Sequence, residues 1–227
     1  MRTVSLSDKS MDDQSKIVHA VILLDASGSM ASIKDDVVGG IDAFIQEQKA
    51  QPGECLLTII DFDSGKPFNI VFAAKPVREI EGFTSNDFTP RGGTPLLDAM
   101  GHLFSYVDQV DEGYTNLVMV FTDGHENSSR EWTNDGVAKL TKEKTDAGWQ
   151  FVYLGANQDA FAVGGGMGFG ARNAGNYNTA HTSSVMANMS TYTSSLRSAA
   201  AGGQTFRPWS DVIEDPNVVQ DASLQSS

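Results

Sequence analysis

Residues 21–30 read "VILLDASGSM", and this stretch predicts both a strand and what the strand presents at its end. The apolar run from Val21 to Leu24 stops at Asp25, and Ser27 and Ser29 then alternate with small residues. A nearly continuous apolar run is typical of a strand that is buried on both faces of a parallel sheet. We therefore expect a buried strand that ends in one carboxylate and two hydroxyls at every second position.

Similar apolar runs alternate with segments of helical length along the chain. The "DSGKP" link before residues 68–72 is as short as a hairpin loop, so we expect that strand to be antiparallel and at the sheet edge. The pattern predicts an α/β fold with a doubly wound, mostly parallel central sheet of about six strands, one antiparallel edge strand and helices on both faces. The expected strands are 17–24, 55–62, 68–72, 116–122, 149–155 and 176–180, and the expected helices are 32–50, 94–110, 133–147, 158–163 and 182–200.

The two ends differ in composition from the middle. Residues 1–15 form a polar N-terminal segment, 16–202 the domain, and 203–227 an acidic tail broken by proline. Phe206 and Trp209 are the apolar anchors of this tail, and they dock either on the domain or on another molecule.

Composition excludes several classes of protein. The 29 acidic residues against 16 Lys and Arg give a net charge of −13, which disfavours nucleic-acid binding and favours cations. The one cysteine, Cys55, opens an apolar run and is expected to be a buried thiol. We expect no signal peptide and no transmembrane segment, and hence a cytoplasmic protein or a virion component, because no apolar run approaches the roughly 18–20 residues that a membrane span needs.

Oxygen-bearing side chains follow two strands that are expected to be parallel. Asp25 ends the first strand, and Asp123 comes directly after the strand at 116–122. Ligands of such sheets bind outside the carboxyl ends of the strands, so these two side chains should face each other. Thr94 is expected to cap a helix whose first turn holds Pro95, while Gly92-Gly93 lets its loop approach closely.

Two carboxylates and three hydroxyls are the hard oxygen ligands of a hard cation. This donor set favours Mg²⁺, with Mn²⁺ as an alternative, over zinc, which prefers histidine and cysteine. Two negative charges offset those of the ion, which would then stay electrophilic toward an incoming carboxylate. The predicted metal ligands are Asp25, Ser27, Ser29, Thr94 and Asp123.

With Thr94 and Asp123, "DASGSM" resembles the DxSxS-based metal-ion-dependent adhesion site of von Willebrand factor A domains. The resemblance covers about residues 17–200 and implies a Rossmann-like fold. It implies that Ser27, Ser29 and Thr94 ligate the metal directly, that Asp25 and Asp123 do so directly or through water, and that a partner's acidic side chain completes the shell. "VVGGIDAFIQEQ", "PRGGTPLLDA" and "TDGHENSSREW" are most similar to small stand-alone members from bacteria and phages. The expected contact rim is Gly28, Gly93, Pro95, His125 and Glu126.

Other kinds of site fit less well. The nucleophile elbow G-x-S-x-G and the phosphate loop G-x-x-x-x-G-K-[ST] are absent. The glycine-rich stretch 164–170 follows a helix instead of a strand, so we expect a flexible loop there. Support of the rim and binding of a second ion are two roles open to Asp61 and Asp63. We expect both to be solvated turn residues instead.

Three functions are compatible with these residues. The leading hypothesis is a protein-binding module, without catalysis of its own, whose metal coordinates an acidic group of a protein partner. The second is a phage virion or assembly component that makes contacts or self-assembles through its tail. The third is a metal-assisted hydrolase that uses His125 and Glu126.

Overall fold

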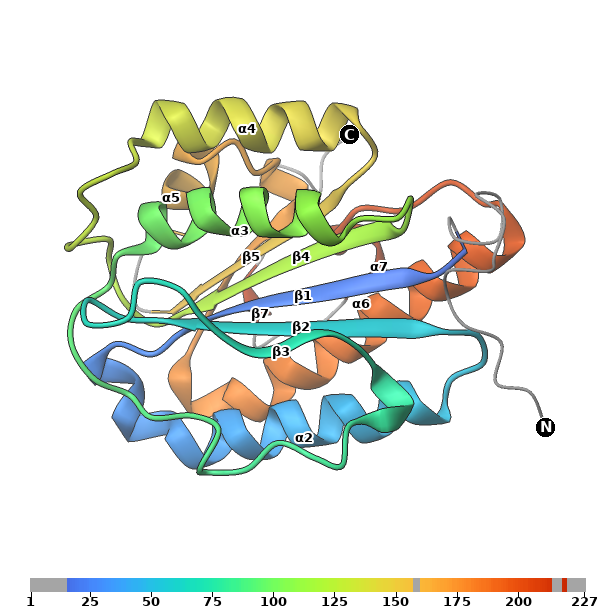
Figure 1. Ribbon diagram of the computed structural model, residues 1–227, viewed down its shortest axis with the longest axis horizontal. Helices are drawn as coiled ribbons and strands as arrows, with labels where there is room; N and C mark the ends of the chain where they lie inside the picture. Colours follow the sequence, from blue (N-terminus) through green and yellow to red (C-terminus); the bar gives the residue numbers. More distant parts are fainter. Residues whose placement is uncertain (1–15, 157–159, 214–217, 220–227) are drawn as a thin grey trace.

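A seven-stranded sheet with helices on both faces forms the body of the protein (Figure 1). The computed structural model describes residues 16–156, 160–213 and 218–219. The strands follow the order β3-β2-β1-β4-β5-β6-β7 across the sheet. They are β1 (Val18–Asp25), β2 (Cys55–Phe62), β3 (Asn69–Pro76), β4 (Thr115–Thr122), β5 (Gln150–Ala156), β6 (Ala174–Tyr177) and β7 (Val218–Val219).

Strand pairing confirms the predicted topology. The central strand β1 pairs in parallel with β2 and β4, and β3 is antiparallel to β2 at one edge. At the other edge, β7 adds an antiparallel pairing to β6 that we did not predict. Two residues are too short a run to carry a strand pattern of their own.

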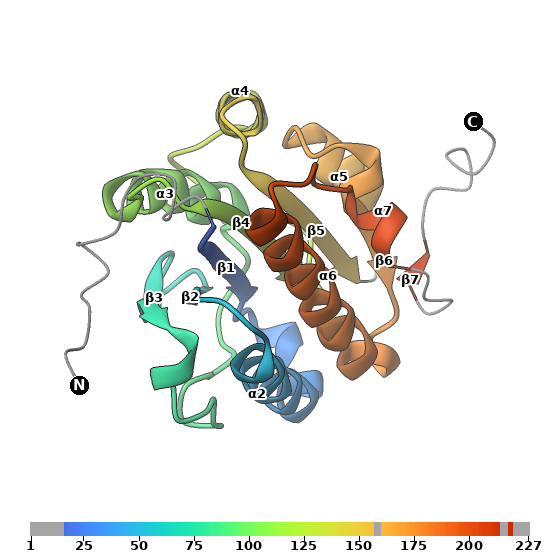
Figure 2. The same cartoon turned by 90° about the vertical axis from the view of Figure 1, so that its right-hand side faces the viewer.

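The helices form a layer on each face of the sheet (Figure 2). Helices α2 and α6 lie side by side on one face, and α3, α4 and α5 cover the other. The helices are α2 (Lys34–Ala50), α3 (Leu96–Val110), α4 (Asn134–Asp146), α5 (Ala160–Gly166), α6 (Thr182–Gly202) and α7 (Trp209–Val212), with short 3-10 turns η2 (Gly28–Ile33), η3 (Val77–Glu79), η4 (Ala171–Asn173) and η5 (Thr179–His181). Among the residues that the structure describes, no helix is both long enough and apolar enough to cross a membrane.

The apolar run of the opening sequence is buried because helices cover both of its faces. Ile22 and Leu24 point into the core shared with α2 and α6, whereas Val21 and Leu23 point into the core under α3. Every residue of β1, β2 and β4 is buried. This two-sided burial explains why the three strands show no polar alternation.

The glycine-rich stretch 164–170 is not the flexible loop that we expected. Its first glycines close α5, and Met167 and Phe169 are buried in the core under α3. Gly168 has a φ of +84°, and a Cβ there would lie 2.9 Å from the carbonyl oxygen of Ala138. The glycine therefore permits close packing against α4.

Candidate metal centre

Asp25 is fixed at the carboxyl edge of the sheet, between its own loop and the end of β4. Its side chain is fully buried. Its Oδ1 accepts a hydrogen bond from the backbone N–H of Ser27 at 2.7 Å, and its Oδ2 accepts one from the hydroxyl of Thr122 at 2.5 Å. We did not predict the contribution of Thr122, because a threonine at the end of a strand carries no signal that distinguishes it from a core residue.

The two serines and Asp123 continue this hydrogen-bonded chain toward the surface. The hydroxyls of Ser27 and Ser29 lie 3.1 Å apart, and the Ser29 hydroxyl donates to Oδ1 of Asp123 at 2.7 Å. Ser27 and Asp123 are buried, whereas Ser29 is exposed. The cluster is therefore closed on the side of the sheet and open to solvent at Ser29.

Thr94 brings the third loop to the same place. A Cβ built on Gly124 would lie 3.1 Å from Oγ1 of Thr94, 3.6 Å from Oδ2 of Asp25 and 3.7 Å from Oγ of Ser27. Oxygens from separate loops thus border one small space beside Gly124, which stays open because this residue has no side chain. The structure brings all five predicted ligand residues together at this edge.

The predicted helix cap at Thr94 is wrong. Helix α3 begins at Leu96, its N-cap is Pro95, and no side chain caps it from that position. Thr94 turns its hydroxyl toward the oxygen cluster instead. The N–H of Leu97 is satisfied by the carboxylate of Glu126, at 3.0 Å.

Burial dominates the electrostatics of the cluster. Desolvation raises the pKa of Asp25 to about 6, and the neighbouring charge of Asp123 adds to this rise. Desolvation also raises the pKa of Asp123. A bound cation would offset both negative charges, and carboxylate and hydroxyl oxygens are ligands that suit Mg²⁺ and Mn²⁺. Among the described residues, no group of three or more His, Cys, Asp or Glu side chains is placed to hold a metal, and the oxygen cluster itself combines two carboxylates with three hydroxyls.

Asp61 and Asp63 are not solvated turn residues, contrary to our expectation. Both are buried, and Oδ1 of Asp61 accepts a hydrogen bond from the side-chain amide of Asn69 at 2.8 Å. Asp63 forms an ion pair with Arg91 at 2.7 Å. This pairing depends on the contact between two distant loops, which the local sequence does not reveal.

The Asp63–Arg91 pair supports a backbone contact between two of the site's loops. The N–H of Arg91 donates to the carbonyl of Ala26 at 2.7 Å, and the N–H of Gly28 donates to the carbonyl of Gly92 at 3.1 Å. Gly92 has a φ of +69°, and a Cβ there would lie 2.6 Å from the Ser64 hydroxyl. The expected close approach of the Gly92-Gly93 loop is therefore present.

The predicted rim residues lie around the cluster in different environments. Gly28 and His125 are exposed, Gly93 is half-buried, and Pro95 is buried. The carboxylate of Glu126 accepts four hydrogen bonds, from the N–H groups of Leu97, Ser128 and Ser129 and from the hydroxyl of Ser129. Glu126 therefore organises its own loop, which leaves little of its carboxylate for a partner or for acid–base chemistry.

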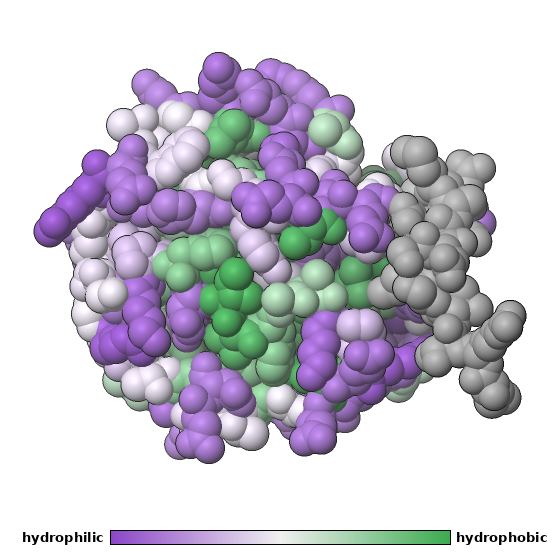
Figure 3. Space-filling model, viewed as in Figure 1, coloured by the Kyte–Doolittle hydropathy of each residue, from purple (hydrophilic) through white to green (hydrophobic). Residues whose placement is uncertain are grey.

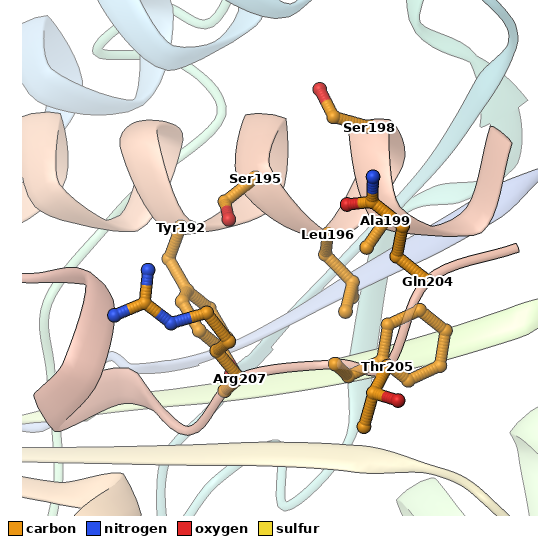
Figure 4. A pocket seen from close by; sticks show the side chains of 9 residues that line it. Tyr192, Ser195, Leu196, Ser198, Ala199, Gln204, Thr205 and Arg207 are labelled. Atoms are coloured by element: carbon orange, nitrogen blue, oxygen red, sulfur yellow. The ribbon is translucent and has the colours of Figure 1, made fainter. Parts of the chain in front are cut away.

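One hollow adjoins the loops of the cluster, and another lies away from them. One, of about 520 Å³, is lined by residues that include Ser64, Pro95 and Asn127, and it adjoins the loop of Thr94. The other, of about 190 Å³, lies between α6 and residues 204–207, with the side chains of Tyr192 and Arg207 at its border (Figure 4). It involves the second half of α6, which runs away from the carboxyl edge of the sheet, so it is separate from the metal centre.

The chain resembles three solved structures in fold. A von Willebrand factor type A protein from Catenulispora acidiphila matches with a TM-score of 0.58 and 12% identity, over 78% of this chain and 42% of its own. The pilus adhesin SpaC from Lactobacillus rhamnosus GG matches with a TM-score of 0.61 and 13% identity, over 76% of this chain and 29% of its own. Proximal thread matrix protein 1 from the mussel byssus, with a zinc-occupied MIDAS motif, matches with a TM-score of 0.55 and 14% identity, over 77% of this chain and 47% of its own.

These likenesses confirm the predicted fold. The chain spans less than half the length of each of the three proteins. No family model matches the sequence, and no curated protein matches it. The virion role inferred from the phage-like segments stays a prediction.

Proposed function

Starting from this von Willebrand factor A fold, we propose that the protein is a metal-dependent protein-binding module. Asp25, Ser27, Ser29, Thr94 and Asp123 hold one divalent cation, with Mg²⁺ or Mn²⁺ as the resident ion. A carboxylate from a protein partner completes the coordination shell. The module recognises its partner and does no chemistry of its own.

One observation carries this proposal, namely the gathering of oxygens from two separate loops around the space beside Gly124, which belongs to a third loop. Oγ1 of Thr94, Oδ2 of Asp25 and Oγ of Ser27 all lie within 3.7 Å of one point there. The hydrogen bond of Ser29 to Asp123 links the remaining two residues to this group. Burying two carboxylates so close together is unfavourable unless a positive charge compensates them.

The charge and exposure of the cluster support an acidic partner. Two carboxylates only balance the two positive charges of a divalent ion and the three hydroxyls are neutral, so the ion can still act as a Lewis acid toward a carboxylate of a partner. Ser29 and Gly28 are exposed at the open side of the cluster, where such a ligand would enter. The similar structures include a pilus adhesin and a protein with a metal-occupied MIDAS motif, which agrees with this kind of function.

Isothermal titration with Mg²⁺ and Mn²⁺ tests the metal site. We expect the natural chain to bind one ion, and we expect Ser27→Ala and Asp25→Ala to give no heat of binding at concentrations that saturate the natural chain. Ser32→Ala is the matched control, because its exposed hydroxyl donates to the Ser29 carbonyl and lies outside the oxygen cluster. Unchanged binding in both site variants would refute the proposed ligands.

A pull-down with and without chelator tests the partner. We expect a bound protein that is released by EDTA, is recovered when Mg²⁺ is restored in excess, and is not retained by Ser27→Ala. Replacing single acidic residues of that protein should then abolish binding at one position. A partner retained equally by the chelated chain and by Ser27→Ala would exclude a metal-dependent contact.

A further inference from the structure

Thr94 belongs to a loop and not to a strand, so its position depends on what holds that loop. Asp25 ends a central strand, and Asp123 directly follows another, so the sheet itself places both. Thr94 lies between β3 and α3, and no strand pairing fixes it. Some other contact must bring its hydroxyl into register with the two carboxylates.

Asn127 makes that contact through both polar groups of the Thr94 backbone. Its side-chain Oδ1 accepts the hydrogen bond of the Thr94 N–H at 2.9 Å, and its own N–H donates to the Thr94 carbonyl at 3.1 Å. Asn127 lies four residues after Asp123 in the loop that joins β4 to α4, and Figure 1 shows this loop at the same end of the molecule as the start of α3. The pair of hydrogen bonds therefore ties one metal ligand to the loop that carries another.

The loop around Asn127 is itself anchored to α3. The Glu126 carboxylate accepts from Leu97 N–H at 3.0 Å, and the Asp98 carboxylate accepts from the N–H groups of Arg130, Glu131 and Trp132, each at 2.9 Å. Asp98 is buried, and its own backbone N–H donates a hydrogen bond to the Ser129 hydroxyl at 3.1 Å. Hydrogen bonds between the helix and the loop therefore run in both directions. The loop thus has little freedom to shift relative to the helix that follows Thr94.

The approach of the two loops leaves no room for a side chain at position 93. A Cβ on Gly93 would lie 2.4 Å from the Ser128 hydroxyl and 2.8 Å from Oδ1 of Asn127. Asn127 therefore packs directly against the residue that precedes Thr94 and also bonds to Thr94. This arrangement fixes the Thr94 backbone against the loop that follows Asp123.

We propose that Asn127 is a positioning residue of the metal centre, which holds the Thr94 hydroxyl where it shares one ion with Asp25 and Asp123. This inference rests on the proposed function. Oxygen ligands of small divalent ions must lie within narrow distances of the ion, about 2.0–2.1 Å for Mg²⁺. Loss of a residue that orients a ligand typically weakens metal affinity by about 10- to 100-fold.

Titration of Mn²⁺ into three variants of the full chain tests the inference. Asn127→Ala removes the acceptor and should weaken Mn²⁺ binding by about 10- to 100-fold. Asn127→Asp keeps an acceptor oxygen at the same place and should stay within a few-fold of the natural chain. Asn173→Ala is the matched control, because Oδ1 of Asn173 also accepts a hydrogen bond from a backbone N–H, that of Trp209, at 3.0 Å. Asn173 directly precedes β6 and so lies at the opposite end of that strand from the metal centre.

Hydrogen exchange of the Thr94 amide in the metal-free chain gives a second measurement. We expect faster exchange of this amide in Asn127→Ala, and protection close to that of the natural chain in Asn127→Asp and Asn173→Ala. A merely structural role would lower the melting temperature of Asn127→Ala without changing its metal affinity.

The possible outcomes separate this inference from the proposed function. If the natural chain takes up no metal, the proposed function fails and the positioning role falls with it. If the natural chain binds Mn²⁺ and Asn127→Ala binds it equally well, or Asn127→Asp is as weak as Asn127→Ala, the positioning role alone is overturned.

Discussion

Asp25 shows at the scale of one residue why a metal would matter to this fold. Its carboxylate is buried at the end of the central strand, with hydrogen bonds from Ser27 and Thr122 and with a second carboxylate, Asp123, close by. Burial raises its pKa to about 6, which means that the fold opposes its negative charge. A cation that binds only the folded chain compensates this charge and stabilises the fold by mass action.

His19 is a second buried titratable residue, at the opposite end of β1, and it makes the fold sensitive to acid. Its Nε2 lies 2.8 Å from the Thr58 hydroxyl and its Nδ1 3.2 Å from Oδ1 of Asn116. Burial lowers its pKa from 6.5 to about 4, although the Asn116 hydrogen bond and the charge of Asp111 oppose this. Between these two pH values the unfolded chain binds a proton that the folded chain does not. The contribution of His19 to stability should therefore fall by up to about 3 kcal/mol as the pH decreases from 6.5 to 4, whereas the raised pKa of Asp25 acts in the opposite direction below pH 6.

Urea unfolding between pH 7 and pH 4 checks the contribution of His19. We expect the natural chain to lose up to about 3 kcal/mol of its free energy of unfolding relative to His19→Gln as the pH decreases from 6.5 to 4, because the contribution of Asp25 is common to both chains. Equal slopes in the natural chain and in His19→Gln would show that other groups cause the acid sensitivity.

The residues of the site differ in how far the sequence predicts them. Asp25, Ser27 and Ser29 form a local pattern after an apolar run, so they could be predicted together. Asn127 could not be predicted, because its role rests on a contact with Thr94, 33 residues away. Hydrogen bonds between loops depend on the tertiary structure, and neither periodicity nor spacing along the chain contains that information.

The elements follow the predicted order because their apolar patterns are strong, and β3 shows where the pattern is insufficient. We expected a strand at 68–72, but β3 runs from Asn69 to Pro76. Pairing with β2 extends the strand through "AAKP", which has no strand pattern of its own. Figure 3 shows apolar side chains gathered on the face that this edge strand crosses, and Ile70 of β3 is 40% exposed.

Ala74 marks a bulge in β3 and should be strained. It has a φ of +42°, and the register shifts so that Ala73 and Ala74 lie opposite Thr58, whose hydroxyl accepts the Ala74 N–H at 2.9 Å. Glycine suits such a position without steric strain. We expect Ala74→Gly to raise the free energy of unfolding by up to about 1 kcal/mol, because relief of strain outweighs the greater entropy of the unfolded chain.

The neighbouring alanine provides the matched control for this prediction. Ala73 has no positive φ, so Ala73→Gly should lower the free energy of unfolding by about 0.5–1 kcal/mol. Urea unfolding of both variants at pH 7 measures the difference. If Ala74→Gly is destabilised as much as Ala73→Gly, the backbone at Ala74 is not strained.

At the scale of the whole molecule, the C-terminal segment closes the core on the α6 side. Trp209 is fully buried in the same core as β1, α2 and α6, and its ring meets that of Tyr192 at 5.5 Å between centroids. Residues 204–207 run alongside α6 on the way and line the cavity drawn in Figure 4 together with residues of that helix. Of the two anchors expected in the tail, Trp209 thus docks on the chain's own domain, and Phe206 packs against the same core while remaining partly exposed.

Removing the Trp209 side chain should therefore destabilise the whole fold. We expect Trp209→Ala to lower the free energy of unfolding by about 3–5 kcal/mol, because it leaves a large cavity between α6 and the sheet. Trp209→Phe is the control: it keeps a ring against Tyr192 and removes an Nε1–H that is buried without a hydrogen-bond partner among the described residues. The decrease in the free energy of unfolding should be clearly smaller for Trp209→Phe than for Trp209→Ala.

Phe206→Ala should also have a smaller effect than Trp209→Ala, since the Phe206 side chain is only partly buried. Urea unfolding followed by circular dichroism measures all three variants, and a single transition in each would show that the segment and the sheet unfold together. If Trp209→Ala instead unfolded at the same urea concentration as the natural chain, the C-terminal segment would not belong to the cooperative unit that supports the metal centre.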